Sequence, residues 1–153
     1  MAISQIALPE LDYLPKLPKD KTPGIGCIGS GFIMADCHLV AYRAAGFNPV
    51  AIASQTPAHA KAVAERHKIE KTYDDYQTLL RDPRVNVLDI AVPPDLQLQV
   101  VRDAVKEAGH IKGILAQKPL GMNFAQAREI VDLCKKAGIK LPAAKPTSKA
   151  GPP

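Results

Sequence analysis

Two glycines in a short turn are the first residues here whose type and spacing could do chemistry. The segment GCIGSGFIMADCH (26–38) joins an apolar run to a helical stretch, and Gly29 and Gly31 occupy the first two positions of the pattern G-x-G-x-x-G. The first glycine allows a tight turn, and the second lets a pyrophosphate approach the backbone N–H groups at a helix N-terminus. We therefore predict a dinucleotide site whose turn contacts come from Gly29, Ser30, Gly31, Phe32 and Ile33.

The third position of the pattern is not glycine. Met34 stands there, so close helix–strand packing requires a different spacing or a small neighbour such as Ala35. A glycine-rich turn also fits a purely structural role or an adenosyl site of the methyltransferase type. Both alternatives stay open at this point.

The next polar group is Ser54-Gln55-Thr56, at the end of the second predicted strand. An Asp or Glu commonly binds the ribose hydroxyls there, and this chain has none. The hydroxyls and the amide can hydrogen-bond a ribose or a 2′-phosphate, with Lys61 and His59 as the nearest cations. We predict NAD or NADP as the cofactor, and the missing carboxylate favours NADP slightly. Alternatively, these residues simply begin and cap a helix.

A lysine ends the fifth apolar run. Gln117-Lys118-Pro119 follows IKGILA (111–116), and the carboxyl end of a parallel strand is where ligands bind in open α/β sheets. Lys118 can act there as a point charge or as a donor in a proton relay. The alternative is a solvated lysine at a strand end.

The elements that must position these residues alternate between strand and helix. Such alternation predicts a doubly wound parallel α/β sheet of the Rossmann type, with strand order 3-2-1-4-5-6. The predicted strands are 24–29, 49–54, 71–73, 87–92, 111–116 and 139–141, and the predicted helices cover 34–45, 57–67, 75–80, 95–108 and 124–137.

Helix ends and buried faces follow from local patterns. Gly46 and Gly138 should end helices, while Thr56, Asp74 or Asp75, and Asn123 should cap helix starts. Helical spacing predicts that the inward residues are Ala60, Val63, Ala64, His67, Val101, Ala104, Val105, Ala108, Phe124, Ala127, Val131 and Cys134.

Composition narrows the classes of protein. With 153 residues, 46% hydrophobic and 23% charged, the chain suits one domain: a leader over 1–22, a Rossmann domain over 23–141 and a disordered Pro/Ala/Lys tail over 142–153. The net charge of +5 is scattered, so we expect no nucleic acid partner. Cys27, Cys37 and Cys134 form no metal or redox motif, and no segment is long and apolar enough for a membrane. We expect a cytoplasmic protein without a metal site.

In this setting the chain resembles the N-terminal domain of the Gfo/Idh/MocA oxidoreductases over roughly residues 23–141. The segments that carry the resemblance are IGSGFIMADCH, AIASQTPAHAKAVAER, YDDYQTLLRDPRVNVLDIAVPPDLQ and above all AQKPLG. It implies a nicotinamide-binding domain of an enzyme that transfers hydride on a sugar, a polyol or a related alcohol or carbonyl.

The resemblance also assigns residues. The family motif Glu-Lys-Pro becomes Gln117-Lys118-Pro119, which implies that Lys118 reaches the substrate hydroxyl and the nicotinamide and that the Pro119 bond is cis. A second motif, Pro-Pro-x-x-His, matches Pro93 and Pro94 but has Gln97 in place of histidine. Gln97 could instead be a surface residue of the helix. The predicted cofactor contacts here are Val92, Pro93, Pro94, Gln97, Gln117 and Pro119.

The family has a second, substrate-binding domain after the sixth strand, where this chain has only its tail. We therefore expect a catalytically incomplete chain whose sugar or polyol pocket needs a partner, with an exposed apolar face beside the sixth strand and a tendency to form homo-oligomers. The alternative is a non-enzymatic nucleotide-binding or sensing module that acts with a partner chain. A third reading is that dinucleotide binding has been lost.

Overall fold

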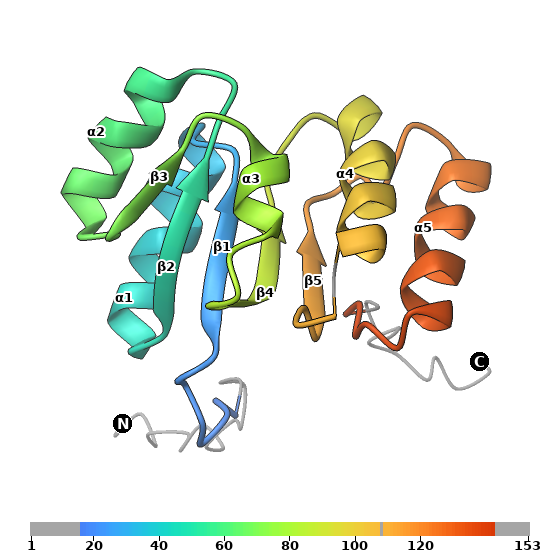
Figure 1. The fold of residues 1–153 in the computed structure, drawn as a ribbon, viewed down its shortest axis with the longest axis horizontal. Coiled ribbons are helices and arrows are strands. Elements are labelled where there is room, and N and C mark those ends of the chain that lie inside the picture. The colour runs from blue at the N-terminus through green and yellow to red at the C-terminus, as the bar shows by residue number, and fades with distance from the viewer. Residues whose placement is uncertain (1–15, 108, 143–153) are drawn as a thin grey trace, which may run out of the picture.

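Five short strands form one parallel sheet with strand order β3-β2-β1-β4-β5 (Figure 1). The structure is a computed structural model that describes residues 16–107 and 109–142. Predictions for residues 1–15, for Ala108 and for the tail from residue 143 lie outside the described residues. The strand order confirms the doubly wound prediction for the first five strands. The strands are β1 (Gly24–Ile28), β2 (Asn48–Ala53), β3 (Lys71–Tyr73), β4 (Val85–Ile90) and β5 (Gly113–Ala116).

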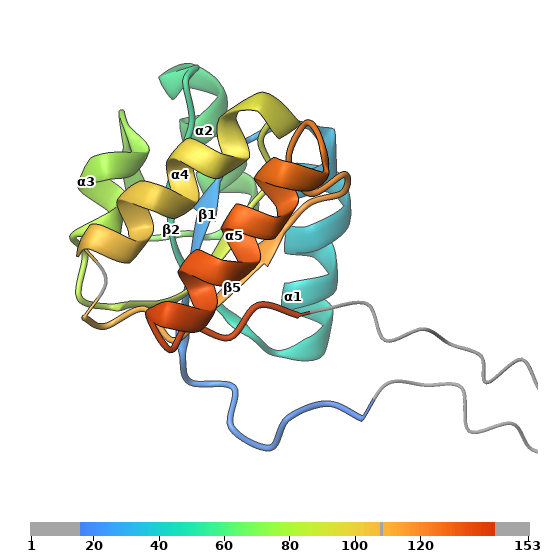
Figure 2. The same cartoon turned by 90° about the vertical axis from the view of Figure 1, so that its right-hand side faces the viewer.

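Helices cover both faces of this sheet, which is why the strands are nearly continuously apolar. Figure 2 shows α3 (Tyr76–Leu80) and α4 (Pro94–Glu107) on one side of the strands and α1 (Leu39–Ala45) on the other. One buried cluster joins β1 and β2 to the first three helices, and the other joins the sheet to the last three. The helices are η1 (Ile33–His38), α1 (Leu39–Ala45), α2 (Pro57–His67), α3 (Tyr76–Leu80), α4 (Pro94–Glu107) and α5 (Phe124–Lys136).

The predicted sixth strand is reduced to a single bridge. Lys140 pairs in parallel with Gly113 at the edge of β5, and the Ile114 N–H donates to the Lys140 carbonyl at 2.9 Å. Pro142 has no N–H group and cannot extend the ladder.

The first helix differs from the prediction of one regular helix. It begins as the π-helix η1, in which the Leu39 N–H donates to the Met34 carbonyl, and continues as α1. Met34 is fully buried and Ala35 is 6% exposed. Ala35 is therefore the small buried neighbour that the sequence suggested, whereas the π-helical turn was not predicted.

Most predicted helix ends are confirmed. Asp75 and Asn123 each accept a backbone N–H at the starts of α3 and α5. Gly46 has φ 74° and Gly138 has φ 68°, the left-handed conformation of helix C-caps. The hydroxyl cap predicted for Thr56 is wrong, because its side chain makes no capping bond.

The buried faces are confirmed for α2 and only in part for α4 and α5. Ala60, Val63, Ala64 and His67 are all buried, as are Val101 and Ala104, whereas Val105 is only partly buried. In α5, Phe124 is 82% and Val131 41% exposed, whereas Ile130 is fully buried beside Cys134. The apolar residues of α5 form two overlapping stripes, one with Phe124 and Val131 and one centred on Ile130. The stripe centred on Ile130 joins the buried cluster of the sheet.

Within the described residues, no helix combines the length and apolar character needed to cross a membrane. All three cysteines are free, with Cys27 and Cys134 buried and Cys37 exposed.

Candidate dinucleotide site

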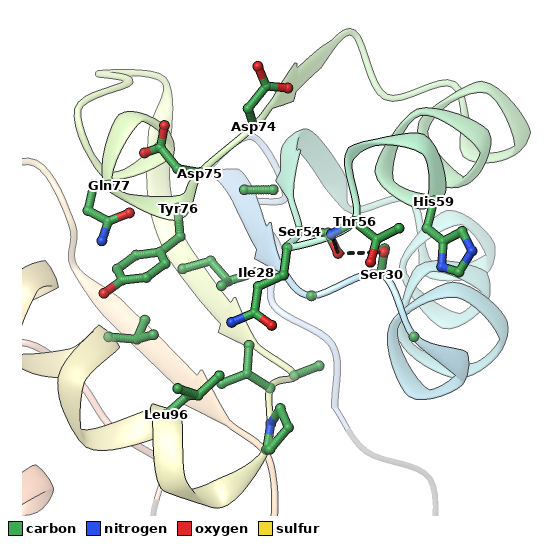
Figure 3. Close-up of a pocket in the computed structure, with 18 of the residues that line it drawn as sticks. Ile28, Ser30, Ser54, Thr56, His59, Asp74, Asp75, Tyr76, Gln77 and Leu96 are labelled. Atoms are coloured by element: carbon green, nitrogen blue, oxygen red, sulfur yellow. Dashed lines mark hydrogen bonds between the residues drawn. The ribbon is translucent and has the colours of Figure 1, made fainter.

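A cavity of about 520 Å³ lies at the carboxyl ends of β1, β2 and β4 and between α3 and α4 (Figure 3). This is the point at which the strand order reverses, because β1 is followed on one side by β2 and on the other by β4. Ligands of open parallel sheets bind at such a switch point. The lining combines five main groups: the glycine turn, the end of β2, the start of α3, the segment after β4 and the first turns of α4.

The two glycines of the turn meet different surroundings. Gly29 has φ 105°, and a Cβ atom there would lie 2.4 Å from the Ala91 carbonyl oxygen. Its N–H donates to the Ala53 carbonyl at 2.8 Å, which ties the turn to β2. A Cβ atom on Gly31 would meet nothing within 4 Å. Gly29 thus serves close packing, while Gly31 leaves open space in the cavity wall.

A helix begins directly after the Gly31 turn. Phe32 precedes η1 and makes no side-chain capping bond. The first N–H groups of a helix lack partners within the helix, and its dipole favours an anion there. The turn has the backbone features of a phosphate site.

The end of β2 supplies hydroxyl groups. Ser30 donates to the Ser54 hydroxyl at 2.8 Å, and the Ser54 oxygen also accepts the Thr56 N–H at 3.3 Å. His59 lines the same wall, and Figure 3 shows it beside Thr56. Lys61 is exposed and is not among the lining residues.

The opposite wall was not predicted. Asp74, Asp75, Tyr76 and Gln77 line it from the start of α3, together with Leu96, Gln99 and Val100 of α4. The Tyr76 hydroxyl donates to Asp103 at 2.8 Å, and burial, followed by Asp103, raises the Tyr76 pKa to about 12. Applying the strand-end rule to β3, and not only to β1 and β2, would have pointed to this group.

About half of the predicted cofactor residues line the cavity. Phe32 is 71% exposed and, like Ile33, is absent from the lining. Pro94 lines a shallow depression beside Pro119 and Phe124. The predicted residues that do line the cavity are Gly29, Ser30, Gly31, Ser54, Gln55, Thr56, Val92 and Pro93.

The lysine segment lies beside the cavity and not in its wall. Gln117 and Lys118 line a second hollow of about 470 Å³ against α5, with Val131, Ile139 and Leu141. Its partly exposed apolar lining agrees with the apolar face expected beside the sixth strand. The Lys118–Pro119 peptide bond is cis, as expected.

Gln97 corrects one sequence interpretation. It is fully buried, so the surface alternative is wrong. Its amide nitrogen donates to the Gln117 carbonyl at 2.8 Å, and its oxygen accepts the Gly121 N–H at 3.1 Å. Gln97 therefore holds the loop after β5 against α4 and does not face the cavity.

Comparison with known proteins gives a consistent family. The profile of GFO_IDH_MocA, described as "Oxidoreductase family, NAD-binding Rossmann fold", matches residues 24–144. Trans-1,2-dihydrobenzene-1,2-diol dehydrogenase of Xenopus tropicalis is 32% identical over 116 residues, which are 76% of this chain and 33% of that protein. D-xylose 1-dehydrogenase (NADP(+)) 2 of Haloferax volcanii is 31% identical over 116 residues, which are 76% and 35% of the two proteins.

Solved structures agree. A levoglucosan dehydrogenase in complex with NADH and levoglucosan superposes with a TM-score of 0.67 at 29% identity, over 76% of this chain and 32% of that one. This chain thus spans about a third of the length of the relatives it matches.

Proposed function

Because this chain belongs to the Gfo/Idh/MocA oxidoreductase family, we propose that its cavity binds a nicotinamide dinucleotide. The observation that carries the proposal is the turn at Gly31, where the cavity wall is open and a helix begins directly afterwards. The residues present fit the ligand. Backbone donors at the turn suit the pyrophosphate, and the Ser54 and Thr56 hydroxyls suit the ribose. Tyr76 and Leu96 provide an apolar wall for a planar base.

We further propose that NADP is accepted at least as well as NAD. No carboxylate follows β2, so nothing at Ser54–Thr56 repels a 2′-phosphate. Among the cavity-lining residues His59 is the nearest to a cation, and no lysine or arginine joins it. This balance predicts a modest preference for NADP. The relatives differ in their dinucleotide: the D-xylose dehydrogenase is named for NADP(+), and the levoglucosan dehydrogenase was solved with NADH.

The proposed reaction is hydride transfer between the nicotinamide and a sugar, a polyol or a related alcohol or carbonyl. The bound nicotinamide supplies the hydride chemistry, and the protein supplies orientation and electrostatics. Lys118, at the end of β5, would contact the substrate oxygen as a hydrogen-bond donor or proton carrier. Lys118 lies outside the cavity wall. We also propose that the described residues provide the cofactor half of the site and that a partner completes the substrate half.

Titration calorimetry on the 153-residue chain tests the binding proposal. NAD and NADP should each bind, and S-adenosylmethionine should not. Binding of S-adenosylmethionine alone would show that the glycine turn belongs to an adenosyl site of the methyltransferase type. Absence of binding by all three would reject a nucleotide site.

A non-enzymatic nucleotide-binding module is the second candidate. The observations that favour it are Gln97, buried and occupied by two backbone bonds, and the placement of Lys118 outside the cavity. The two candidates separate when the chain is incubated with NAD(P) and levoglucosan or D-xylose, with and without a partner recovered by affinity capture. Nicotinamide reduction only in the presence of the partner supports the enzyme, and binding without any reduction supports the module.

Two further expectations belong to this proposal. A chain whose substrate half is supplied from outside should form complexes, either with a second copy of itself or with another protein. Three free cysteines are consistent with the reducing environment of the cytoplasm.

A further inference from the structure

A partly buried polar network lies next to the lysine segment, and its residues do not line the cavity described above. Asp89 of β4 has no exposed surface, and its Oδ2 accepts the Tyr42 hydroxyl at 2.6 Å and lies 2.8 Å from His38 Nδ1. Its Oδ1 has no hydrogen-bond partner among the described residues. Burial raises the Asp89 pKa, while the bonds from Tyr42 and His38 act in the opposite direction.

The network continues from His38 to the lysine segment. His38 Nε2 lies 3.1 Å from the Gln117 side-chain nitrogen. The Gln117 side-chain oxygen accepts the backbone N–H of Lys118 at 2.9 Å. Three contacts therefore connect the buried carboxylate of β4 to the backbone that carries Lys118.

The backbone N–H of Lys118 fixes the position of every proton in this hydrogen-bond network. A backbone N–H can only donate, so the Gln117 atom facing Lys118 must be the oxygen. The other amide atom, the NH₂ group, then faces His38 and donates to Nε2. His38 must accept at Nε2 and carry its proton on Nδ1, which donates to Asp89. A second proton on the ring would place two donors against each other at Gln117.

The same segment is held from its other side. Gln97 donates to the Gln117 carbonyl and accepts the Gly121 N–H. These two bonds attach one side of the segment to α4. On the other side, the Lys118 N–H is held by the Gln117 side chain, which in turn contacts His38.

We propose that His38 is a positioning residue. As a neutral imidazole protonated on Nδ1, it orients the Gln117 amide and thereby fixes the backbone of Lys118 at the end of β5. The inference rests on the role proposed above for Lys118, while its structural content is independent of the dinucleotide. It also explains what glutamine does at position 117: an amide can donate to a neutral ring, which a carboxylate cannot.

Nitrogen-15 NMR of the histidine rings in the full chain, without any nucleotide, tests the assignment directly. The wild-type His38 signals should show a protonated Nδ1 and an unprotonated Nε2. In Gln117→Glu, a carboxylate oxygen faces the ring in place of the amide NH₂ group and can only accept, so Nε2 should carry a proton and donate to it. A purely structural histidine predicts no such change. A wild-type ring protonated on Nε2 would overturn the proposal, and this measurement requires no variant to fold.

Hydrogen exchange tests the positioning effect. In His38→Leu, the Lys118 amide should exchange roughly tenfold faster than in the wild type, because its acceptor is no longer oriented. Gln126→Ala is the matched control: its oxygen accepts the Met122 N–H in the same loop at 2.9 Å, so it should release Met122 and leave Lys118 protected. Equal acceleration of Lys118 in both variants would show general loosening and reject a specific role. A chain that fails to bind dinucleotide but gives the expected tautomer and exchange would refute only the function proposed above.

Discussion

At the scale of single residues, the two turn glycines serve different purposes although they are two positions apart. Gly29 adopts a left-handed φ and packs against the Ala91 backbone, whereas Gly31 borders open space. A side chain at the first position conflicts with the fold, and a side chain at the second would conflict with the proposed dinucleotide. Stability and binding should therefore separate between the two substitutions.

We expect Gly29→Ala to lower the free energy of unfolding by roughly 2–4 kcal/mol, because it combines backbone strain with a steric clash. Gly31→Ala should leave stability nearly unchanged and weaken NAD(P) binding about tenfold or more. Denaturant unfolding and calorimetric titration measure the two effects. Equal loss of stability in both variants, or unchanged binding by Gly31→Ala, would contradict the assignment of the turn.

Ser54 carries the prediction on cofactor choice. Ser54→Asp places a carboxylate at the end of β2, where it can accept from ribose hydroxyls and repels a 2′-phosphate. NADP affinity should fall about tenfold or more relative to NAD affinity. Ser54→Asn is the uncharged control, and it should change the ratio of the two dissociation constants much less. An unchanged ratio in Ser54→Asp would place the ribose elsewhere.

At the scale of elements, helix starts that look alike in the sequence differ in the structure. Asn123 accepts the Gln126 N–H at 3.0 Å at the start of α5, whereas Thr56 makes no capping bond at the start of α2. Asn123→Ala should cost about 1 kcal/mol of stability. Thr56→Ala should cost a few tenths or less, and thermal unfolding of the pair compares them directly. A larger cost for Thr56→Ala would show that its hydroxyl caps the helix in solution.

The connection between α3 and β4 contains a buried charge that predicts a pH dependence. Hydrogen bonds from the Arg84 side chain, opposed by burial and aided by Tyr73, hold the Asp82 pKa at about 2, below the value of about 3.9 expected in the unfolded chain. A pKa lowered by folding stabilises the native state above the unfolded value, and this stability is lost as the pH falls from about 4 toward 2.

Asp82→Asn should therefore flatten the pH dependence of unfolding in this window and cost roughly 1–3 kcal/mol at neutral pH. Asp132→Asn, an exposed position on α5, makes the same charge change without disturbing this connection. Urea unfolding across the acid range compares the two variants. A wild-type slope retained in Asp82→Asn would assign the acid sensitivity to another group.

At the scale of the whole molecule, the cavity joins elements from both halves of the sheet. Its walls come from β1, β2 and β4 and from α3 and α4. A ligand that binds only the folded chain stabilises it by about 2.7 kcal/mol at one hundred times its dissociation constant. For a chain of this size we expect the melting temperature to rise by roughly 5–10 °C under that condition.

Differential scanning calorimetry with saturating NADP measures this rise. Gly31→Ala at the same NADP concentration should show a smaller one, and S-adenosylmethionine should show none. A melting temperature that is independent of NADP in the wild type would mean that the cavity does not bind the cofactor.

The sequence by itself determined the features that depend on local chemistry. Alternating apolar runs and helical spacing predicted the α/β class and the order of five strands, because a parallel strand covered on both faces must be apolar. Glycine sterics predicted the turn at Gly29 and the caps at Gly46 and Gly138. The glycine pattern and the strand-end rule predicted the parts of the cavity that follow β1 and β2, and the family resemblance predicted the part that follows β4.

Only the tertiary structure decided which distant side chains meet. The α3 wall with Tyr76, the burial of Gln97 and the contact of His38 with Asp89 join residues far apart in the chain. These contacts depend on strand order, on register and on which of two apolar stripes a helix buries, as in α5. Local spacing does not encode the distance between elements, so no pattern along the chain could have placed Lys118 beside the cavity and not in its wall.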